Sequence, residues 1–143
     1  MTTGAILLAA GFSRRFGSIK LNAVLPDGRT VLQHTSHLLA ATVSEFLVVT
    51  RPALLDAGVL QHTAINQSQI VLCQDAEMGM GHSLRCGIRA LPEHWDACLV
   101  CLADMPFIKP ATLQRLLAMA SPQRIVIPEY NQHRGHPVCF GRD

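Results

Sequence analysis

AILLAAGFSRRFGSIK, residues 5–20, decides the fold, because a short apolar run ends there at a glycine and a basic loop follows. Ala5–Ala10 is apolar at every position and is followed at once by Gly11. Such a run predicts a strand that is buried on both faces. A strand of this kind needs cover on both sides, so the rest of the chain is expected to supply further strands and helices.

Apolar runs alternate with helical patterns along the rest of the chain. We predict further strands at Glu45–Thr50, Gln69–Cys73, Ala97–Leu102, Arg124–Pro128 and Pro137–Phe140. We predict helices at Val31–Ala41, Pro52–Leu60, Ser83–Leu91 and Ala111–Ala120. Thr30 and Gln33 have the spacing of a capping box at the start of the first helix. The alternation predicts an α/β fold, a three-layer Rossmann-like arrangement in which a mostly parallel sheet carries helices on both faces.

Composition restricts the kinds of partner. The 143 residues carry a formal net charge of +2, which indicates neither a nucleic-acid partner nor a membrane surface. No apolar run approaches the roughly 20 residues that a membrane helix needs. The 5 cysteines are odd in number and irregularly spaced, and no secretory signal precedes them, so we expect reduced thiols in a cytoplasmic protein.

The loop after the first strand is the strongest candidate for binding a phosphate. Gly11 and Gly17 allow close approach of backbone amides, and Arg14, Arg15 and Lys20 bring positive charge that no nearby acid neutralises. The spacing fits neither a P-loop nor a dinucleotide fingerprint. The alternative is a solvated surface loop whose arginines only aid solubility.

Two further segments also follow predicted strands. Asp104 comes directly after Ala97–Leu102, and a carboxylate at this place is a natural magnesium ligand. Gly79 and Gly81 precede Ser83, whose hydroxyl and free amides at a helix start could contact a nucleotide. A turn aspartate and an ordinary capped helix start are the alternatives.

Other polar side chains give weaker signals. Arg134 and His136 could line the far side of the same cleft, although a surface turn is equally compatible with the sequence. His34 and His37 lie one helical turn apart without a third ligand, so we expect no zinc site. Cys98 and Cys101 are three apart on a predicted strand and should point to opposite faces, which argues against a metal or redox pair.

Four segments together resemble the molybdenum cofactor nucleotidyltransferases, a MobA-like NTP transferase family, and especially their cytidylyltransferase branch. The segments are LLAAGFSRRFGSIK (7–20), EMGMGHSLRCGI (77–88), CLADMPFI (101–108) and RGHPVCFGR (134–142). The first occurs widely among nucleotidyltransferases, whereas its combination with DMPF and RGHP is much more specific. The resemblance implies a fold of the nucleotide-diphospho-sugar transferase type.

The resemblance also implies site residues. Arg15, Lys20 and Asp104 would be catalytic, with Asp104 holding Mg²⁺. Arg134 and His136 would line the substrate pocket. The residues implied to bind the nucleotide are Leu8, Ala9, Ala10, Gly11, Gly81 and Ser83.

The implied reaction moves a nucleoside monophosphate onto the terminal phosphate of molybdopterin and releases pyrophosphate. Ala10 stands where the guanylyl branch has the first glycine of a pair, which favours CTP over GTP. A molybdoenzyme of the xanthine dehydrogenase type is the implied protein partner. Transfer to a sugar or polyol phosphate remains an alternative, as does a non-catalytic protein that binds and delivers the molybdenum cofactor.

Members of that family continue further and carry another acidic Gly-Asp motif. We therefore expect residues 1–143 to form one MobA-like domain that is C-terminally truncated and lacks its last part.

Overall fold

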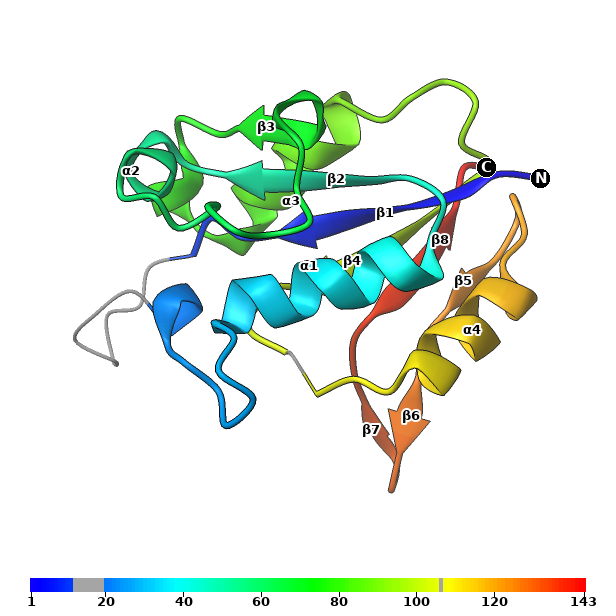
Figure 1. The fold of residues 1–143 in the computed structure, drawn as a ribbon. Helices are drawn as coiled ribbons and strands as arrows, with labels where there is room; N and C mark the ends of the chain where they lie inside the picture. Colours follow the sequence, from blue (N-terminus) through cyan, green and yellow to red (C-terminus); the bar gives the residue numbers. More distant parts are fainter. Residues whose placement is uncertain (12–19, 106) are drawn as a thin grey trace.

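The structure is a computed structural model that describes residues 1–11, 20–105 and 107–143, with only the backbone of Lys20. Its centre is a six-stranded sheet in the order β3-β2-β1-β4-β8-β5 (Figure 1). β1, β2, β3 and β4 run parallel, and β8 runs antiparallel to both β4 and β5. The strands of this sheet are β1 (Thr3–Leu8), β2 (Phe46–Thr50), β3 (Ile70–Leu72), β4 (Ala97–Leu102), β5 (Ile125–Val126) and β8 (Val138–Gly141).

Four α-helices and three 3₁₀ turns connect these strands in the described part of the chain. The helices are α1 (Val31–Thr42), α2 (Pro52–Asp56), α3 (Met80–Arg89) and α4 (Pro110–Met119). The 3₁₀ turns are η1 (Lys20–Asn22), η2 (Gln67–Gln69) and η3 (Ala76–Met78). None of the described helices combines the length and the apolar character required to cross a lipid bilayer.

Two apolar clusters, one on each face of the sheet, confirm the predicted three-layer α/β fold. Leu7 of β1 belongs to the cluster that includes Leu39 of α1 and Leu113 of α4. The neighbouring Ile6 belongs to the other cluster, against which Leu84 of α3 packs. Successive residues of β1 thus enter opposite layers, which explains why the strand is apolar throughout.

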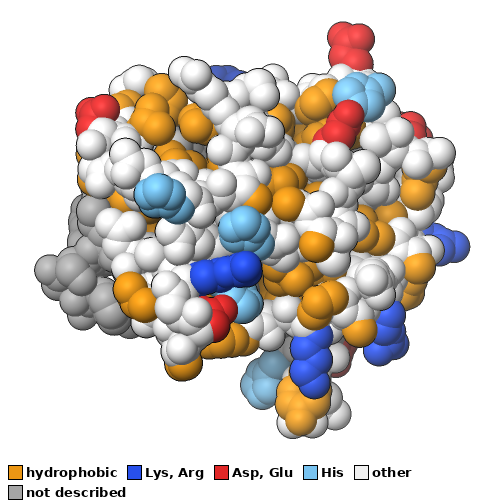
Figure 2. All heavy atoms as spheres, in the orientation of Figure 1, with side chains coloured by type: hydrophobic (Ala, Val, Ile, Leu, Met, Phe, Trp, Pro, Cys, Tyr) orange, Lys and Arg blue, Asp and Glu red, His pale blue; other side chains and the backbone are white. Residues whose placement is uncertain are grey.

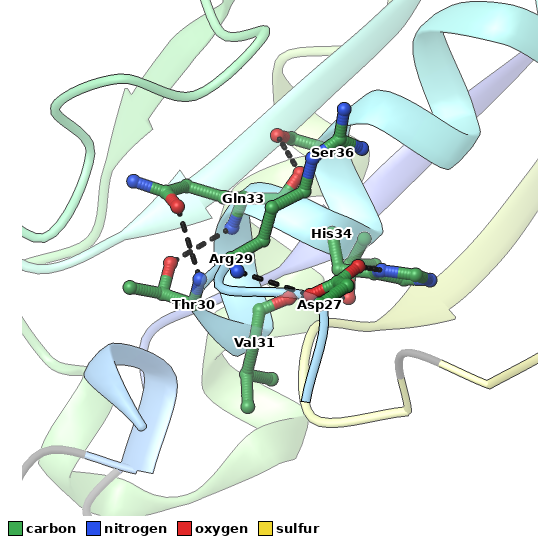
Figure 3. Close-up of polar contacts among 8 residues, drawn as sticks. Asp27, Arg29, Thr30, Val31, Gln33, His34 and Ser36 are labelled. Carbon is green, nitrogen blue, oxygen red and sulfur yellow. Dashed lines mark hydrogen bonds and ion pairs between the residues drawn. The ribbon is translucent and has the colours of Figure 1, made fainter. Parts of the chain in front are cut away.

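The start of α1 forms as the sequence predicts. Thr30 Oγ1 accepts a hydrogen bond from the Gln33 amide at 3.1 Å, and Gln33 Oε1 accepts one from the Thr30 amide at 3.0 Å (Figure 3). Two backbone donors that the first helical turn leaves unpaired are satisfied by this exchange.

α3 packs against the sheet at Gly87, which has no side chain to keep the helix away. A Cβ at Gly87 would lie 3.0 Å from Val49 Cγ2 and 3.1 Å from Ile6 Cδ1. Both distances are tighter than ordinary carbon contacts, so any larger residue would push the helix outward.

Several boundaries differ from the predicted ones. α2 ends at Asp56, before the predicted Leu60, because the chain turns at Gly58 with a φ of +76°. α3 begins at Met80, three residues before the predicted Ser83. A hairpin of β6 (Glu129–Tyr130) and β7 (His133–Arg134) was not predicted, and it projects beyond the main sheet (Figure 1).

Candidate functional site

The carboxyl ends of the parallel strands meet at one edge of the sheet. The chain passes from β1 to β2 on one side, whereas the connection from β3 to β4 returns to the other side of β1. The connections after β1 and β4 therefore diverge, and open α/β sheets bind ligands in the crevice that such a divergence leaves. This edge carries the segments that begin at Ala9, Cys73 and Ala103 (Figure 1).

Main-chain hydrogen bonds hold these three segments side by side. The Ala103 amide donates to Leu8 O at 3.1 Å, and the Ala9 amide donates to Val49 O at 2.8 Å. The Cys73 amide donates to Thr50 O at 2.8 Å. Asp104 thus follows a residue that is bonded directly to the end of β1, where the glycine-containing loop begins.

Two buried hydroxyls fix the carbonyls at this edge. Thr50 Oγ1 donates to Ala9 O at 2.9 Å, and Thr35 Oγ1 of α1 lies 3.0 Å from both Ala103 O and Val31 O. Thr50 is 1% exposed and Thr35 is 3% exposed, so water does not compete for these bonds. Sequence reasoning missed both residues, although the threonine that ends the apolar run EFLVVT was a usable signal.

The predicted nucleotide-binding residues after β1 differ in exposure. Leu8, Ala9 and Ala10 are buried, so their side chains belong to the core. Gly11 and Gly81 are exposed, and a Cβ at either glycine would meet no described atom within 4 Å. Packing against the described residues therefore does not require glycine at these two positions.

The loop before α3 places its free amides differently from the prediction. Ser83 is buried, and its amide already donates to Gly79 O at 3.3 Å inside the helix. Because α3 begins at Met80, the amides of Met80 and Gly81 are the ones that lack a partner within the helix. The expectation of a free amide at Ser83 is therefore wrong.

An exposed polar pair lies next to the loop that contains Asp104. His34 Nδ1 is 3.1 Å from Asp27 Oδ2 (Figure 3). The His34 ring lies 6.1 Å from the ring of Phe107, centroid to centroid. The hydrogen bond from the Arg29 amide, and secondarily His34, hold the pKa of Asp27 below its usual value. Asp104 is exposed too, so acidic groups from both loops face solvent at this corner. No sequence motif predicted that Asp27 would lie beside the loop with Asp104.

The remaining predicted residues divide into two groups. Arg14, Arg15 and the side chain of Lys20 lie outside the described residues. Val138 of β8 pairs with Val100 of β4, so the chain before β8 leads back towards the carboxyl end of β4. His136 lies there and is half-buried. Arg134 is exposed in the hairpin, where its backbone stands opposite Glu129 of the neighbouring strand.

Charged side chains are scattered over the face drawn in Figure 2. The acidic and basic side chains of the described residues form no large patch of one sign there. A surface cavity beside the edge strand β3 is lined by residues such as Leu55, Leu60, Ile65 and Leu72. No described candidate residue is among its lining side chains, so it does not mark the candidate site.

One group of side chains could hold a soft metal ion. Cys73, Asp75 and Cys86 each offer a ligand atom, and these atoms lie within 4.8 Å of one another. Cys73 and Cys86 are joined in a disulfide with a Cα–Cα distance of 5.9 Å, which corrects the expectation that all the thiols are reduced. Sequence spacing did not reveal the pair, because the folding of α3 onto the sheet creates it.

Cys98 and Cys101 belong to opposite apolar clusters, as predicted.

Several known proteins are similar to this chain in sequence or in fold. The family described as "MobA-like NTP transferase domain" matches residues 5–143. Purine catabolism protein PucB of Bacillus subtilis is 31% identical over 94% of this chain and 68% of PucB. Bifunctional protein GlmU of Corynebacterium aurimucosum is 30% identical over 96% of this chain, but the chain spans only 29% of GlmU. The crystal structure of Rv0371c from Mycobacterium tuberculosis is similar with a TM-score of 0.85 and 27% identity, covering 99% of this chain and 72% of Rv0371c. Rv0371c has also been determined in complex with manganese.

Proposed function

This chain belongs to the family of MobA-like NTP transferase domains, and from that premise we propose that it moves CMP from CTP onto the terminal phosphate of molybdopterin. Pyrophosphate is the second product. The choice of molybdopterin as the acceptor and of CTP as the nucleotide rests on the four segments that resemble the molybdenum cofactor cytidylyltransferases.

One observation carries the proposal. The hydrogen bond from the Ala103 amide to Leu8 O brings the start of the loop after β1 next to the start of the segment with Asp104, at the switch point of the sheet. A polyphosphate between them would have glycine-rich backbone on one side and a carboxylate on the other. This arrangement suits a nucleotide whose charge is shared between amide donors and a cation.

Backbone supplies the nucleotide pocket in this proposal. Leu8, Ala9, Ala10 and Gly11 form the proposed nucleotide-binding segment, and the main chain of its last two residues would approach the base and phosphates. The buried Leu8 and Ala9 would hold that main chain in place, because their backbone groups are hydrogen-bonded to neighbouring segments. The amides of Met80 and Gly81, which have no partner within the helix, would meet an anion at the start of α3. Open space at Gly11 and Gly81 supports this role, because no described neighbour occupies it.

Asp104 would hold a divalent cation, and we propose Mg²⁺. An exposed carboxylate at a strand end fits a cation that takes one or two protein oxygens and completes its shell with phosphate and water. The manganese complex of Rv0371c supports a divalent ion in a similar protein. A bound Mg²⁺ would supply charge neutralisation for the phosphates.

The chemistry asks little of a general base. A phosphate monoester is already ionised near neutral pH, so an acceptor oxygen can form a bond to the α-phosphorus of CTP while the bond to pyrophosphate breaks. The obstacle is repulsion between the two anions. At about 4 Å and an effective dielectric constant of about 20, a unit charge changes this energy by roughly 4 kcal/mol. Arg15 and Lys20 would supply such charges, and Arg134 and His136 would line the acceptor side.

Release of pyrophosphate tests the proposal directly. The full chain is incubated with CTP, GTP or ATP, each with molybdopterin, with sugar or polyol phosphates, or without an acceptor. Release that requires CTP and molybdopterin supports the proposal, and release with a sugar phosphate instead would replace the acceptor. Nucleotide binding without any release would favour a delivery protein.

The variant Lys20→Ala tests the role of positive charge in the first loop. We expect turnover to fall at least about tenfold, since one phosphate-facing charge is lost. Arg115→Ala removes one positive charge from the exposed face of α4 and should leave turnover unchanged. Equal turnover in the Lys20 variant and the wild type would remove Lys20 from the mechanism.

A further inference from the structure

The disulfide between Cys73 and Cys86 encloses the loop proposed to bind the nucleotide. Cys73 follows β3 directly, and Cys86 lies in α3, 13 residues further along the chain. The enclosed segment, residues 74–85, contains η3 and the first turn of α3 with Gly79, Gly81 and Ser83. Any change in this bond therefore acts on the part of the chain that would meet the phosphates.

Backbone packing brings the two cysteines together independently of the bond. The Cys73 amide donates to Thr50 O at 2.8 Å, which ties Cys73 to the end of β2, and its side chain is fully buried. Cys86 precedes Gly87, whose missing side chain allows α3 to approach Val49 and the sheet. The two sulfur atoms would consequently remain neighbours in the reduced protein.

This pair differs in environment from the other three cysteines. Cys98, Cys101 and Cys139 are free and buried in the sheet. Burial raises the pKa of Cys98 and of Cys101 to about 12, so their thiols seldom ionise or react. Cys86, in contrast, is only half-buried, which gives an oxidant access to one member of the pair.

We propose that Cys73 and Cys86 form a reversible redox pair that closes the nucleotide loop when oxidised and loosens it when reduced. The redox pair stands by itself, whereas its effect on nucleotide binding rests on the function proposed above. The oxidised loop has less freedom to lose when a nucleotide binds, so the oxidised protein binds CTP more tightly.

The oxidant is a low-molecular-weight disulfide such as oxidised glutathione. The accessible Cys86 thiolate attacks one sulfur of that disulfide, forming a mixed disulfide and releasing one small thiolate. The Cys73 thiolate then attacks Cys86 Sγ and releases the second small thiolate. The two protons lost by the cysteines are taken up by the two released thiolates, and a small dithiol reverses both steps.

Asp75 raises a metal site as the alternative to the redox pair. Its Oδ1 lies 3.2 Å from Cys73 Sγ and 3.7 Å from Cys86 Sγ, so two thiolates and this carboxylate could also bind zinc. Zinc binding and the disulfide exclude each other, because both use the same sulfur atoms. Asp75 is exposed and would be the only oxygen ligand in the described cluster, which favours the redox pair.

The experiment compares the full chain after treatment with oxidised glutathione and after treatment with a phosphine reductant. Alkylation followed by mass measurement should find two fewer reactive thiols in the oxidised chain. Hydrogen exchange over residues 74–85 should be slower in that state, and CTP should bind at least about 5-fold more tightly. Cys86→Ser should abolish all three differences, and Cys139→Ala should retain them.

Several outcomes would overturn the redox pair: no disulfide in the folded oxidised chain, equal exchange in both states, or a reduced chain that retains zinc and resists oxidation. Equal CTP affinity despite a redox-dependent loop would overturn its control of binding. Redox-dependent exchange with no CTP binding in either state would support the redox pair and count against the proposed function. The two proposals can therefore fail separately.

Discussion

Replacing Thr50 by valine tests whether buried hydroxyls position the first loop. The substitution keeps the side-chain shape and removes the 2.9 Å hydrogen bond to Ala9 O. Leaving a buried acceptor without its donor costs about 1–3 kcal/mol. We take about 1.5 kcal/mol, because the backbone next to the exposed Gly11 can relax towards solvent.

Urea denaturation measures this loss. With a slope of about 2 kcal/mol per molar urea, a loss of about 1.5 kcal/mol lowers the midpoint by about 0.8 M at an unchanged slope. CTP affinity should fall as well, because the Ala9 backbone positions the adjoining Ala10 and Gly11 of the proposed pocket. The free energy of unfolding and the dissociation constant are measured on the same preparations.

Two further variants make the Thr50 experiment specific. Thr50→Ser keeps the hydroxyl and should retain nucleotide affinity despite the loss of a methyl group. Thr42→Val removes a hydroxyl whose bonds to described residues lie within α1, to Leu38 O at 2.7 Å and weakly to Leu39 O, so it should change stability little. If Thr50→Val stays within about 0.5 kcal/mol of the wild type and binds CTP normally, the reasoning is refuted.

Three more predictions concern the metal, the helix position and acid. Asp104→Ala should abolish the dependence of pyrophosphate release on Mg²⁺ concentration, and an unchanged titration would exclude Asp104 as a ligand. Gly87→Val should lower the unfolding free energy by about 1–3 kcal/mol, because α3 must move away from Ile6 and Val49; an unchanged urea midpoint would contradict the close packing. Hydrogen bonds from Trp95 and then His94 lower the pKa of Glu45, so its stabilisation is present above the usual carboxyl pKa and is lost as the pH falls through the lowered one. Stability measured from about pH 6 to about pH 3 should therefore fall less steeply in Glu45→Gln, and parallel curves would refute this.

Sequence periodicity predicted the sheet core well, because burial on both faces leaves a clear signal. The run ACLVCL was predicted as the strand Ala97–Leu102, and β4 has these bounds. The capping box at Thr30 also follows from local chemistry alone. Burial applies to every residue of the strand, and the capping box is a contact within its own segment. Both features can therefore be predicted from local sequence.

The hairpin of β6 and β7 was missed because its signal is weak. Its strands are two residues each and exposed, so they show no apolar alternation. Its turn uses Asn131 and Gln132 with φ values of 50° and 66°. Glycine usually marks such a turn, and glutamine at a positive φ is uncommon, so composition does not reveal it.

The site was predictable only where strand ends determine it. Asp104 and the first loop were placed at one edge because each follows an apolar run. The contacts of Thr35 with Ala103 O and of His34 with Asp27 depend on how α1 lies across the sheet. The Cys73–Cys86 pair depends in turn on the approach of α3, which a single glycine permits. Contacts of this kind join different elements, so the local sequence of one element does not predict them.

The described edge uses backbone more than side chains to organise the candidate site. Amides of Ala9, Cys73 and Ala103 join neighbouring strands, and the two threonine hydroxyls bond to carbonyls rather than to charged groups. Such bonds survive many substitutions, because every residue except proline carries the same main-chain donors and acceptors. A scaffold built in this way can hold the phosphates common to all nucleoside triphosphates while its loops change. Discrimination among bases and acceptors must then come from side chains added to this edge.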